Sequence, residues 1–421
     1  MRRLLRLWLI STLLACTIAL SAAPGNVILI LCNGVNLAQL ELARQAGIRR
    51  AGLSGMAALP SAGTLLPLTG RYRSQQIAAL NALASGYAGD TTLGVTSSGD
   101  ELESLLGEAR LQGRRTGFIT DGALNDWPGG AFFARENPLP RLDRIEAWLP
   151  LCDIDFLGGA LVRSKPVTLE PLEMPMSRLG YLLARTPGEL RAASAGRRLF
   201  ATHDPAAEPS ALLSYMDTAL RLLPGKNGMF LVADCSRPAR AAAVNDTAGV
   251  IRELWRFDRV LCRALDFFKA APGRTLIVVV SLYDIGDLQL PRPVSQDFPV
   301  GLTRPEILER LSAGRLSGRD ALKLAGAGEL FAPNSRELAA VLDSYSRLAE
   351  SPLPRSFAPW LDRLLHQRDR HEGVEWLTRT VTISLTPVFA IGVGAKEYEG
   401  EYNALELHEK LRGSLGIGKR P

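Results

Sequence analysis

Short apolar runs alternate with amphipathic segments along most of the chain. Residues 26–31, Asn-Val-Ile-Leu-Ile-Leu, are rich in β-branched side chains and end at a small polar turn, as strands buried on both faces do. Runs of similar character predict further strands at 116–120, 153–159, 198–202, 228–234, 274–281 and 387–392. Because helical patterns separate these runs, we predict an α/β fold with a central, mostly parallel sheet and helices on both faces.

The intervening helices are predicted at 99–113, at 208–223 and after Asn245. In the last of these, apolar residues recur at three- and four-residue steps: Val250, Leu254, Phe257, Leu261, Leu265 and Phe268. We expect this stripe to face the sheet. We also expect Asn245 to cap the helix, because an Asn side chain can accept N–H groups of a first turn.

Two segments fall outside this alternation. Residues 1–23 combine basic residues, an apolar run and small residues, which predicts a secretory signal cleaved near Ala22 or Ala23. Leu-Leu-Ala-Cys, ending at Cys16, also fits a lipoprotein cleavage site loosely, and an uncleaved anchor is a third alternative, although the run is short for a spanning helix. We therefore predict export to the periplasm or the extracellular space, with membrane attachment only if the N-terminus is retained or Cys16 is lipidated.

The second segment, 292–375, is polar, Arg-rich and mainly helical in pattern, and its ends contain several prolines. We predict that it is an insert or cap. The core would then comprise residues 24–291 and be completed by 376–421.

Composition narrows the function classes. The 421 residues are 47% hydrophobic and 22% charged, as in ordinary globular proteins. The formal charge of +6 falls to about +3 without the three N-terminal arginines, which is too weak and too dispersed to indicate nucleic-acid binding. The P-loop, Gly-x-Gly-x-x-Gly, Gly-x-Ser-x-Gly and Ser-x-x-Lys patterns are absent, so the common nucleotide-binding and serine-hydrolase signatures are excluded.

Residues that bind metals are few. Of the four histidines, His366 and His371 are five positions apart and therefore do not share a helix face. The cysteines beyond the N-terminal segment lack Cys-x-x-Cys spacing, which excludes a zinc ribbon: they are Cys32, Cys152, Cys235 and Cys262. Sequence alone leaves any disulfide pairing among them open.

Several segments, taken in order, resemble the bacterial alkaline phosphatase family. Cys-Asn-Gly-Val-Asn at 32–36 stands where that family has Gly-Asp-Gly-Met-Gly, and residues 74–86 have the length of its nucleophile segment. Matches continue at 124–132, 233–246, 275–288 and 374–395, the second and the last of them without gaps. The resemblance implies an alkaline phosphatase-like fold, two zinc ions, one magnesium ion and hydrolysis of phosphate monoesters.

The positions that carry the family's chemistry are almost all changed. By the resemblance, one zinc site corresponds to Ala239, Ala243 and Val381, and the other to Asn33, Leu282, Tyr283 and Gln76. Gln76 replaces the nucleophilic serine, and an amide cannot attack phosphorus. The magnesium site corresponds to Asn33, Asn125, Trp127 and Asp234. Zinc needs several N, S or O ligands, which Ala, Val and Leu lack, so we expect neither zinc nor magnesium and no other cofactor.

We therefore predict an exported pseudoenzyme that uses a phosphatase scaffold for binding or structure. The alternative is a phosphate-monoester hydrolase with a rebuilt site. Arg237, Arg240 and Arg379 lie inside the degenerate motifs and could hold an anion where metal ions stood, or could simply face solvent. The sequence names no partner, and the resemblance leaves a homodimer open.

The resemblance also yields two packing expectations. Cys32 and Cys235 adjoin positions of the former magnesium site and should approach each other at the pocket floor, whether or not they are bonded. Gln76, Trp127 and Tyr283 are larger than the Ser, Thr and His of the family. We expect them to fill the pocket, because protein interiors tolerate few voids.

Overall fold

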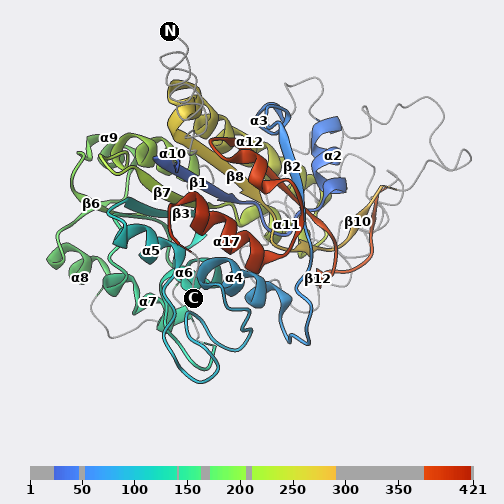
Figure 1. Ribbon diagram of the computed structural model, residues 1–421, viewed down its shortest axis with the longest axis horizontal. Helices are drawn as coiled ribbons and strands as arrows, with labels where there is room; N and C mark the ends of the chain where they lie inside the picture. The colour runs from blue at the N-terminus through green and yellow to red at the C-terminus, as the bar shows by residue number, and fades with distance from the viewer. Residues whose placement is uncertain are drawn as a thin grey trace, which may run out of the picture.

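A single ten-stranded sheet runs through the part of the chain that the structure describes (Figure 1). The computed structural model describes residues 23–46, 53–139, 142–162, 171–204, 211–290 and 374–418. The strand order is β14-β2-β13-β8-β1-β7-β3-β4-β6-β5. The strands are β1 (Asn26–Leu31), β2 (Ser61–Leu65), β3 (Arg115–Ala123), β4 (Phe156–Ala160), β5 (Tyr181–Ala184), β6 (Arg198–Thr202), β7 (Met229–Asp234), β8 (Thr275–Val280), β13 (Thr386–Gly392) and β14 (Gly400–Tyr402).

The centre of the sheet agrees with the sequence prediction. β1 pairs in parallel with β7 and β8, so that Leu31 lies opposite both Asp234 and Val280. All three strands are fully buried, which explains their unbroken apolar sequences. Strands predicted from apolar runs at 26–31, 228–234 and 274–281 are thus neighbours in one mostly parallel sheet, as predicted.

The prediction is less accurate at the sheet's edges. β13 is antiparallel to both β8 and β2. The sequence prediction missed β2, β5 and β14, which are only three to five residues long. The predicted strand at 153–159 begins only at Phe156. The preceding turn places Asp153 in the left-handed region at φ 51°, which is not a strand conformation.

The helices form two groups on opposite faces of the sheet (Figure 1). On one side pack α2 (Leu37–Ala46), α3 (Ser54–Ala57), α9 (Pro187–Ala192), α10 (Ala211–Leu222), α11 (Arg237–Ala242) and α12 (Thr247–Ala270). On the other side pack α4 (Gln75–Ser85), α5 (Leu105–Leu111), α6 (Trp127–Phe133), α7 (Leu142–Glu146) and α17 (Ala404–Ser414). The short helix α8 (Glu173–Arg178) packs beside β5 at the sheet edge. Among the described helices, none is long and apolar enough to cross a lipid bilayer.

The observed helices begin directly after N-cap residues, and two of these starts differ from the sequence prediction. The apolar stripe of α12 is buried as expected, with Phe268 partly exposed. The prediction that Asn245 caps this helix is wrong: Asp246 is the N-cap and accepts the Gly249 N–H at 2.9 Å, whereas Asn245 has a left-handed φ of 55°. Likewise, α5 starts after its cap Ser104 and does not extend over the whole of 99–113.

The chain on either side of residues 291–373 comes together in two small antiparallel ladders. β10 (Leu288–Gln289) pairs with β11 (Glu375–Trp376), and β9 (Asp284–Ile285) pairs with β12 (Val381–Thr382). The chain therefore leaves the core and returns to it at adjacent positions. The predicted insert at 292–375 and the predicted signal at 1–23 lie almost wholly outside the described residues, as do Cys16, His366 and His371, and those predictions remain open.

Candidate functional site

The site positions predicted from the sequence lie together at the carboxyl ends of the central strands β1, β7 and β8. This end of the central strands is called the sheet edge from here on. Asn33 follows β1, Asp234 ends β7, and Leu282 and Tyr283 follow β8. The parallel register brings these strand ends to the same level, which is where α/β proteins place their ligand sites. Gln76, in the first turn of α4, completes the group through its contact with Tyr283.

Gln76 and Tyr283 bond to each other. The Gln76 Nε2 donates to the Tyr283 hydroxyl at 3.0 Å. Tyr283 is buried, and burial raises the pKa of its phenol far above the usual range, with a further contribution from the Asp234 carboxylate. The phenol is therefore neutral.

Asn33 is used as a structural link. Its side chain is buried, and Oδ1 accepts the backbone N–H of Leu282 at 2.9 Å. This bond ties the turn after β1 to the turn after β8. The Nδ2 atom is buried without a partner among the described residues. A neutral amide suits a backbone N–H, and it supplies no negative charge to attract a cation.

Asp234, the one carboxylate among the positions that the resemblance assigns to metal ligands, is held by two hydroxyl groups. Oδ2 accepts from Thr120 Oγ1 at 2.8 Å and from Ser236 Oγ at 2.5 Å. Oδ1 is buried without a hydrogen-bond partner in the described part of the chain. Burial raises the pKa of Asp234 to about 6, although the two hydroxyl bonds and the Arg240 charge lower it. The Asp234 carboxyl thus titrates at about pH 6, because its hydrogen bonds and the Arg240 charge offset only part of the cost of burying its negative charge.

The other aligned positions serve packing. Ala239 on α11 lies against the turn at Gly34, where a Cβ would come within 2.7 Å of Ala239; Gly34 itself has a left-handed φ of 78°. Ala243 and Val381 are half-buried. Asn125 is buried and exchanges two hydrogen bonds with the backbone of Val162, at 2.8 and 3.0 Å, so its amide joins the ends of β3 and β4.

Trp127 is the first residue of α6 and is partly buried. Its backbone N–H donates to Oδ1 of the cap residue Asp126. The bulky ring does pack against the core, as the filled-pocket prediction requires. The sequence prediction places all three larger residues in one pocket. A hydrogen bond joins only two of them, Gln76 and Tyr283.

The three candidate anion-binding arginines have different surroundings. Arg237 Nε lies 3.1 Å from Glu253 Oε2, and both side chains are about nine-tenths buried. Arg240 Nη2 is 3.9 Å from Asp126 Oδ2 and lowers the pKa of Asp234. Arg379 is exposed on the bend between β11 and β12. Of the three, Arg240 has the position best suited to an anion at the sheet edge.

Sequence reasoning missed Thr120, Asp121 and Ser236. Asp121 follows Thr120 in β3, and its Oδ1 accepts the backbone N–H groups of Ser236 at 2.8 Å and Arg237 at 3.2 Å. Burial and the neighbouring Asp234 raise its pKa to about 7, while Arg237 lowers it. The available signal was the abrupt change from apolar to polar residues at the ends of the β3 and β7 runs.

Cys32 and Cys235 follow β1 and β7 at matching positions. The Cys235 N–H donates to the Leu31 carbonyl at 2.8 Å, which continues the ladder beyond Leu31 and Asp234. Neighbouring strands lie about 4.8 Å apart, so the two residues are adjacent, as predicted. Both thiols are buried and unbonded, and the other two described cysteines are free as well.

Solved structures with the same architecture are alkaline phosphatases. The enzyme from Thermus thermophilus matches with a TM-score of 0.77 at 20% identity, covering 94% of this chain and 92% of that one. The cold-active enzyme from the psychrophile Shewanella sp. matches with a TM-score of 0.74 at 18% identity, covering 93% and 99%. The chain has the alkaline phosphatase fold. The fold predicted from the ordered motifs is thereby confirmed.

Curated sequences give the same relationship more weakly. Alkaline phosphatase 4 of Bacillus subtilis is 22% identical over 364 residues, 81% of this chain and 76% of that protein. The repressible alkaline phosphatase of Saccharomyces cerevisiae is 32% identical over 82 residues, which is 20% of this chain and only 14% of the yeast protein. No protein-family model matches the chain.

Zinc does not fit the residues at the positions that the family resemblance assigns to zinc ligands. Ala239, Ala243, Leu282 and Val381 carry no donor atoms, and Tyr283 is a buried, neutral phenol already bonded to Gln76. Within the described ranges, no group of three or more His, Cys, Asp or Glu side chains is arranged to hold a metal ion. No catalytic step through zinc follows from this donor set.

Proposed function

We propose that this protein is an exported pseudoenzyme that keeps the alkaline phosphatase scaffold and acts in binding or structure. The observation that carries the proposal is the hydrogen-bond pattern at the sheet edge. Gln76 bonds to Tyr283, and Asn33 bonds to the backbone of Leu282. Side chains at positions aligned with the nucleophile and with metal ligands thus form hydrogen bonds to other groups of the same chain.

The electrostatics favour the same conclusion. A two-metal phosphatase neutralises the charge on the entering and leaving oxygens with its cations. Here Asp234 provides the single carboxylate among the aligned positions, and burial together with the Asp126 charge raises its pKa. The nearby guanidinium of Arg240 provides positive charge there as a permanent side chain.

The alternative is a phosphate-monoester hydrolase with a rebuilt site. It would have to draw on the groups found at this end of the sheet, which include the Asp234 and Asp121 carboxyls, the Ser236 hydroxyl and Arg240. Arginine can hold a phosphate bidentately, but it supplies no nucleophile. Binding of phosphate without turnover would therefore still support the pseudoenzyme proposal.

Metal analysis and a hydrolysis assay on the same sample test the proposal. The purified protein is dialysed against zinc and magnesium, washed, analysed for bound metal, and assayed with a chromogenic phosphate ester with and without added metal. We expect no stoichiometric zinc and no hydrolysis above that of the Asp234→Asn variant. Metal-dependent turnover that this substitution abolishes would overturn the proposal.

Export is tested separately. Cell fractionation followed by N-terminal sequencing of the recovered protein should find it outside the cytoplasm, beginning near Pro24. Recovery from the membrane fraction with a modified Cys16 would indicate the lipoprotein alternative. Recovery of the full N-terminus from the cytoplasm would contradict export.

A further inference from the structure

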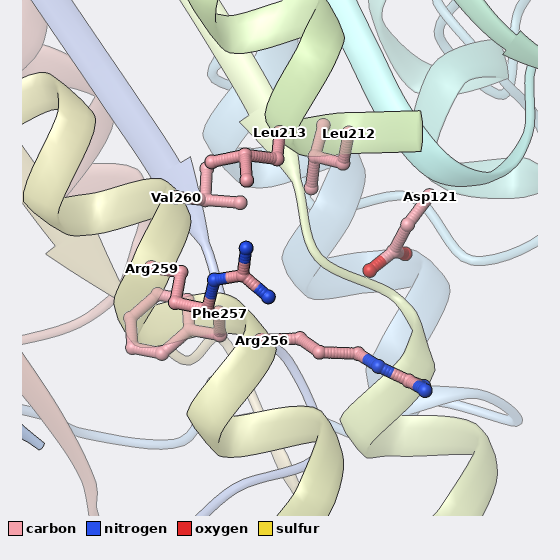
Figure 2. A pocket seen from close by; sticks show the side chains of 7 residues that line it. All are labelled: Asp121, Leu212, Leu213, Arg256, Phe257, Arg259 and Val260. Carbon is pink, nitrogen blue, oxygen red and sulfur yellow. The ribbon is translucent and has the colours of Figure 1, made fainter. Parts of the chain in front are cut away.

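Two cysteine side chains lie next to each other on the face of the sheet that α12 covers. Cys32 and Cys235 follow the register pair Leu31 and Asp234, so they occupy matching positions on neighbouring chain segments. Because successive residues of an extended chain point to opposite faces, both side chains point away from the face of Leu31 and Asp234. Asp121 has the matching position in β3, and its side chain is directed into the space beside α12 (Figure 2).

The two thiols have no hydrogen-bonding role among the described residues. Cys32 is 4% exposed and Cys235 is fully buried. Neither sulfur atom forms a disulfide or a hydrogen bond in the described part of the chain. The other two described cysteines differ, since Cys152 Sγ donates to a backbone carbonyl at 3.1 Å and Cys262 Sγ lies 3.8 Å from a carboxylate oxygen. The pair therefore offers two soft donor atoms that the fold itself does not use.

The spacing of the strands suits an ion between the two sulfur atoms better than a bond between them. Matching Cβ atoms on parallel neighbours lie about 4.8 Å apart, as their strands do. A disulfide needs Cβ atoms about 3.5–4.5 Å apart. A metal ion with a bond of about 2.3 Å to each of two thiolates joins sulfur atoms about 4.6 Å apart. The strand spacing therefore matches a linear, two-coordinate ion.

A small hollow gives Cys32 an approach from outside the sheet. It lies between the strand ends and the helices α2, α3 and α12, and it has room for about one water-sized atom. Met56 of α3 lines it together with Cys32, so a soft thioether accompanies the thiol. Ser281 is the one hydroxyl residue among the described lining residues, and its Oγ is already bonded to the Val35 N–H and the Tyr283 carbonyl. The hollow thus offers sulfur in preference to oxygen.

The charges around the pair favour a cation. Burial raises the pKa of both thiols well above the usual range, with further contributions from the carboxylates of Asp121 and Asp234. Both thiols are therefore protonated in the absence of a metal. The same negative charges attract a cation, and a thiol that coordinates a metal ion loses its proton.

We propose that Cys32 and Cys235 bind one Cu(I) ion as a two-coordinate thiolate site. Thiolate and thioether sulfur select Cu(I), whereas zinc requires three or four ligands. Binding forms two Cu–S bonds, breaks two S–H bonds and releases two protons to solvent, and copper keeps its oxidation state. Two ligands suffice, so the site is compatible with the lack of any metal-binding group of three or more His, Cys, Asp or Glu side chains within the described ranges.

The proposal goes beyond the proposed function. Neither cysteine is among the positions aligned with zinc or magnesium ligands, and both point away from the face of Asp234. The expectation of no metal cofactor concerned those aligned positions. The copper site is therefore independent of whether the sheet edge is inactive or catalytic.

Anaerobic titration with Cu(I) tests the proposal. The purified full chain is titrated with Cu(I), kept reduced by ascorbate, in competition with a colorimetric Cu(I) chelator. We expect one Cu(I) per chain. Cys32→Ala and Cys235→Ala should each weaken binding by more than about a hundredfold, because even an outer-sphere partner of a metal ligand accounts for about 10–100-fold in affinity.

Cys152→Ala and Cys262→Ala are the matched controls, because they remove free thiols outside the pair. They should leave Cu(I) affinity unchanged, and circular dichroism should show all four variants folded. X-ray absorption at the copper edge of the loaded wild-type chain is independent of the variants, and we expect sulfur neighbours only. Failure to take copper from the chelator, equal weakening by a control, nitrogen or oxygen neighbours, or a disulfide between Cys32 and Cys235 in the isolated protein would each overturn the proposal.

Discussion

The Gln76 amide donates a hydrogen bond to the Tyr283 hydroxyl across the sheet edge. One residue belongs to the first turn of α4 and the other to the chain just after β8. By the family resemblance, these positions carry the nucleophile and a zinc ligand in alkaline phosphatases. In this chain the same two positions join two elements that come from distant parts of the sequence.

The contribution of this bond can be measured. Tyr283→Phe should reduce the free energy of unfolding by about 1 kcal/mol, because it removes one hydrogen bond and leaves the Gln76 amide without its acceptor. Urea denaturation measures the change. Tyr72→Phe is the control, since the Tyr72 hydroxyl has no hydrogen-bond partner among the described residues. A loss for Tyr283→Phe no larger than for Tyr72→Phe would contradict the assignment.

The central strands could be predicted from the sequence because burial on both faces restricts them to apolar residues. β1, β7 and β8 are covered on both faces, so their positions are apolar whichever way they point, except at the strand ends Asn26, Asp234 and Thr275. β2 was missed because its constraint is not hydrophobic. At Gly63 a Cβ would come within 2.2 Å of the Tyr398 carbonyl oxygen, so the requirement is for close backbone approach.

The site was predictable only in part for a related reason. The aligned motifs identified Asn33 and Asp234, and the parallel register brings both to one edge. Motifs do not specify hydrogen-bond partners, which depend on the distance between elements in space. The hydroxyls that hold Asp234, and the turning of Asn125 toward Val162, required the structure.

The raised pKa of Asp234 has a consequence for stability. The carboxyl titrates near pH 4 when unfolded and at about 6 when folded. Between these values the folded state retains a proton that the unfolded state has lost. The free energy of unfolding should therefore fall as pH rises through this window, by at most about 3 kcal/mol.

Asp234→Asn should remove this part of the pH dependence, because the amide oxygen can still accept from Thr120 and Ser236 without becoming charged. Chemical denaturation at several pH values measures the slope. The charges of Asp126 and Arg240 remain, and burial of Asp121 leaves a residual slope, which is smaller than in the wild type because the Asp234 charge also raises the Asp121 pKa. Asp217→Asn, at an exposed position, is the control, and an unchanged slope in Asp234→Asn would refute the prediction.

Arg237 is expected to contribute more to stability than Arg379, although both lie in the degenerate motifs. Arg237 forms a buried ion pair with Glu253, and loss of one partner from such a pair is costly. Glu253 keeps a second partner in Arg256, so we expect Arg237→Ala to cost about 3 kcal/mol.

Arg379→Ala should cost less than about 0.5 kcal/mol, because that side chain is exposed. Thermal unfolding of both variants gives the comparison. Similar small losses would mean that the Arg237 pair contributes little.

Restoring the family's residues should not restore the family's chemistry step by step. Gln76→Ser supplies a hydroxyl but no metal to activate it, so we expect hydrolysis of a chromogenic ester to stay at background. Ala239→Asp and Ala243→His together should also fail without Val381→His, because a catalytic zinc needs about three protein ligands.

Ala239→Asp has a further obstacle, since the turn at Gly34 already contacts Ala239 closely. We expect this substitution alone to destabilise the protein by about 1–3 kcal/mol, as overpacked sites do. Ala243→His, at a half-buried position, is the matched comparison and should cost less. Metal content and turnover, measured together for each variant, check the series. Stoichiometric zinc with turnover in Gln76→Ser alone would show that the chain retains a metal site that its aligned positions do not supply.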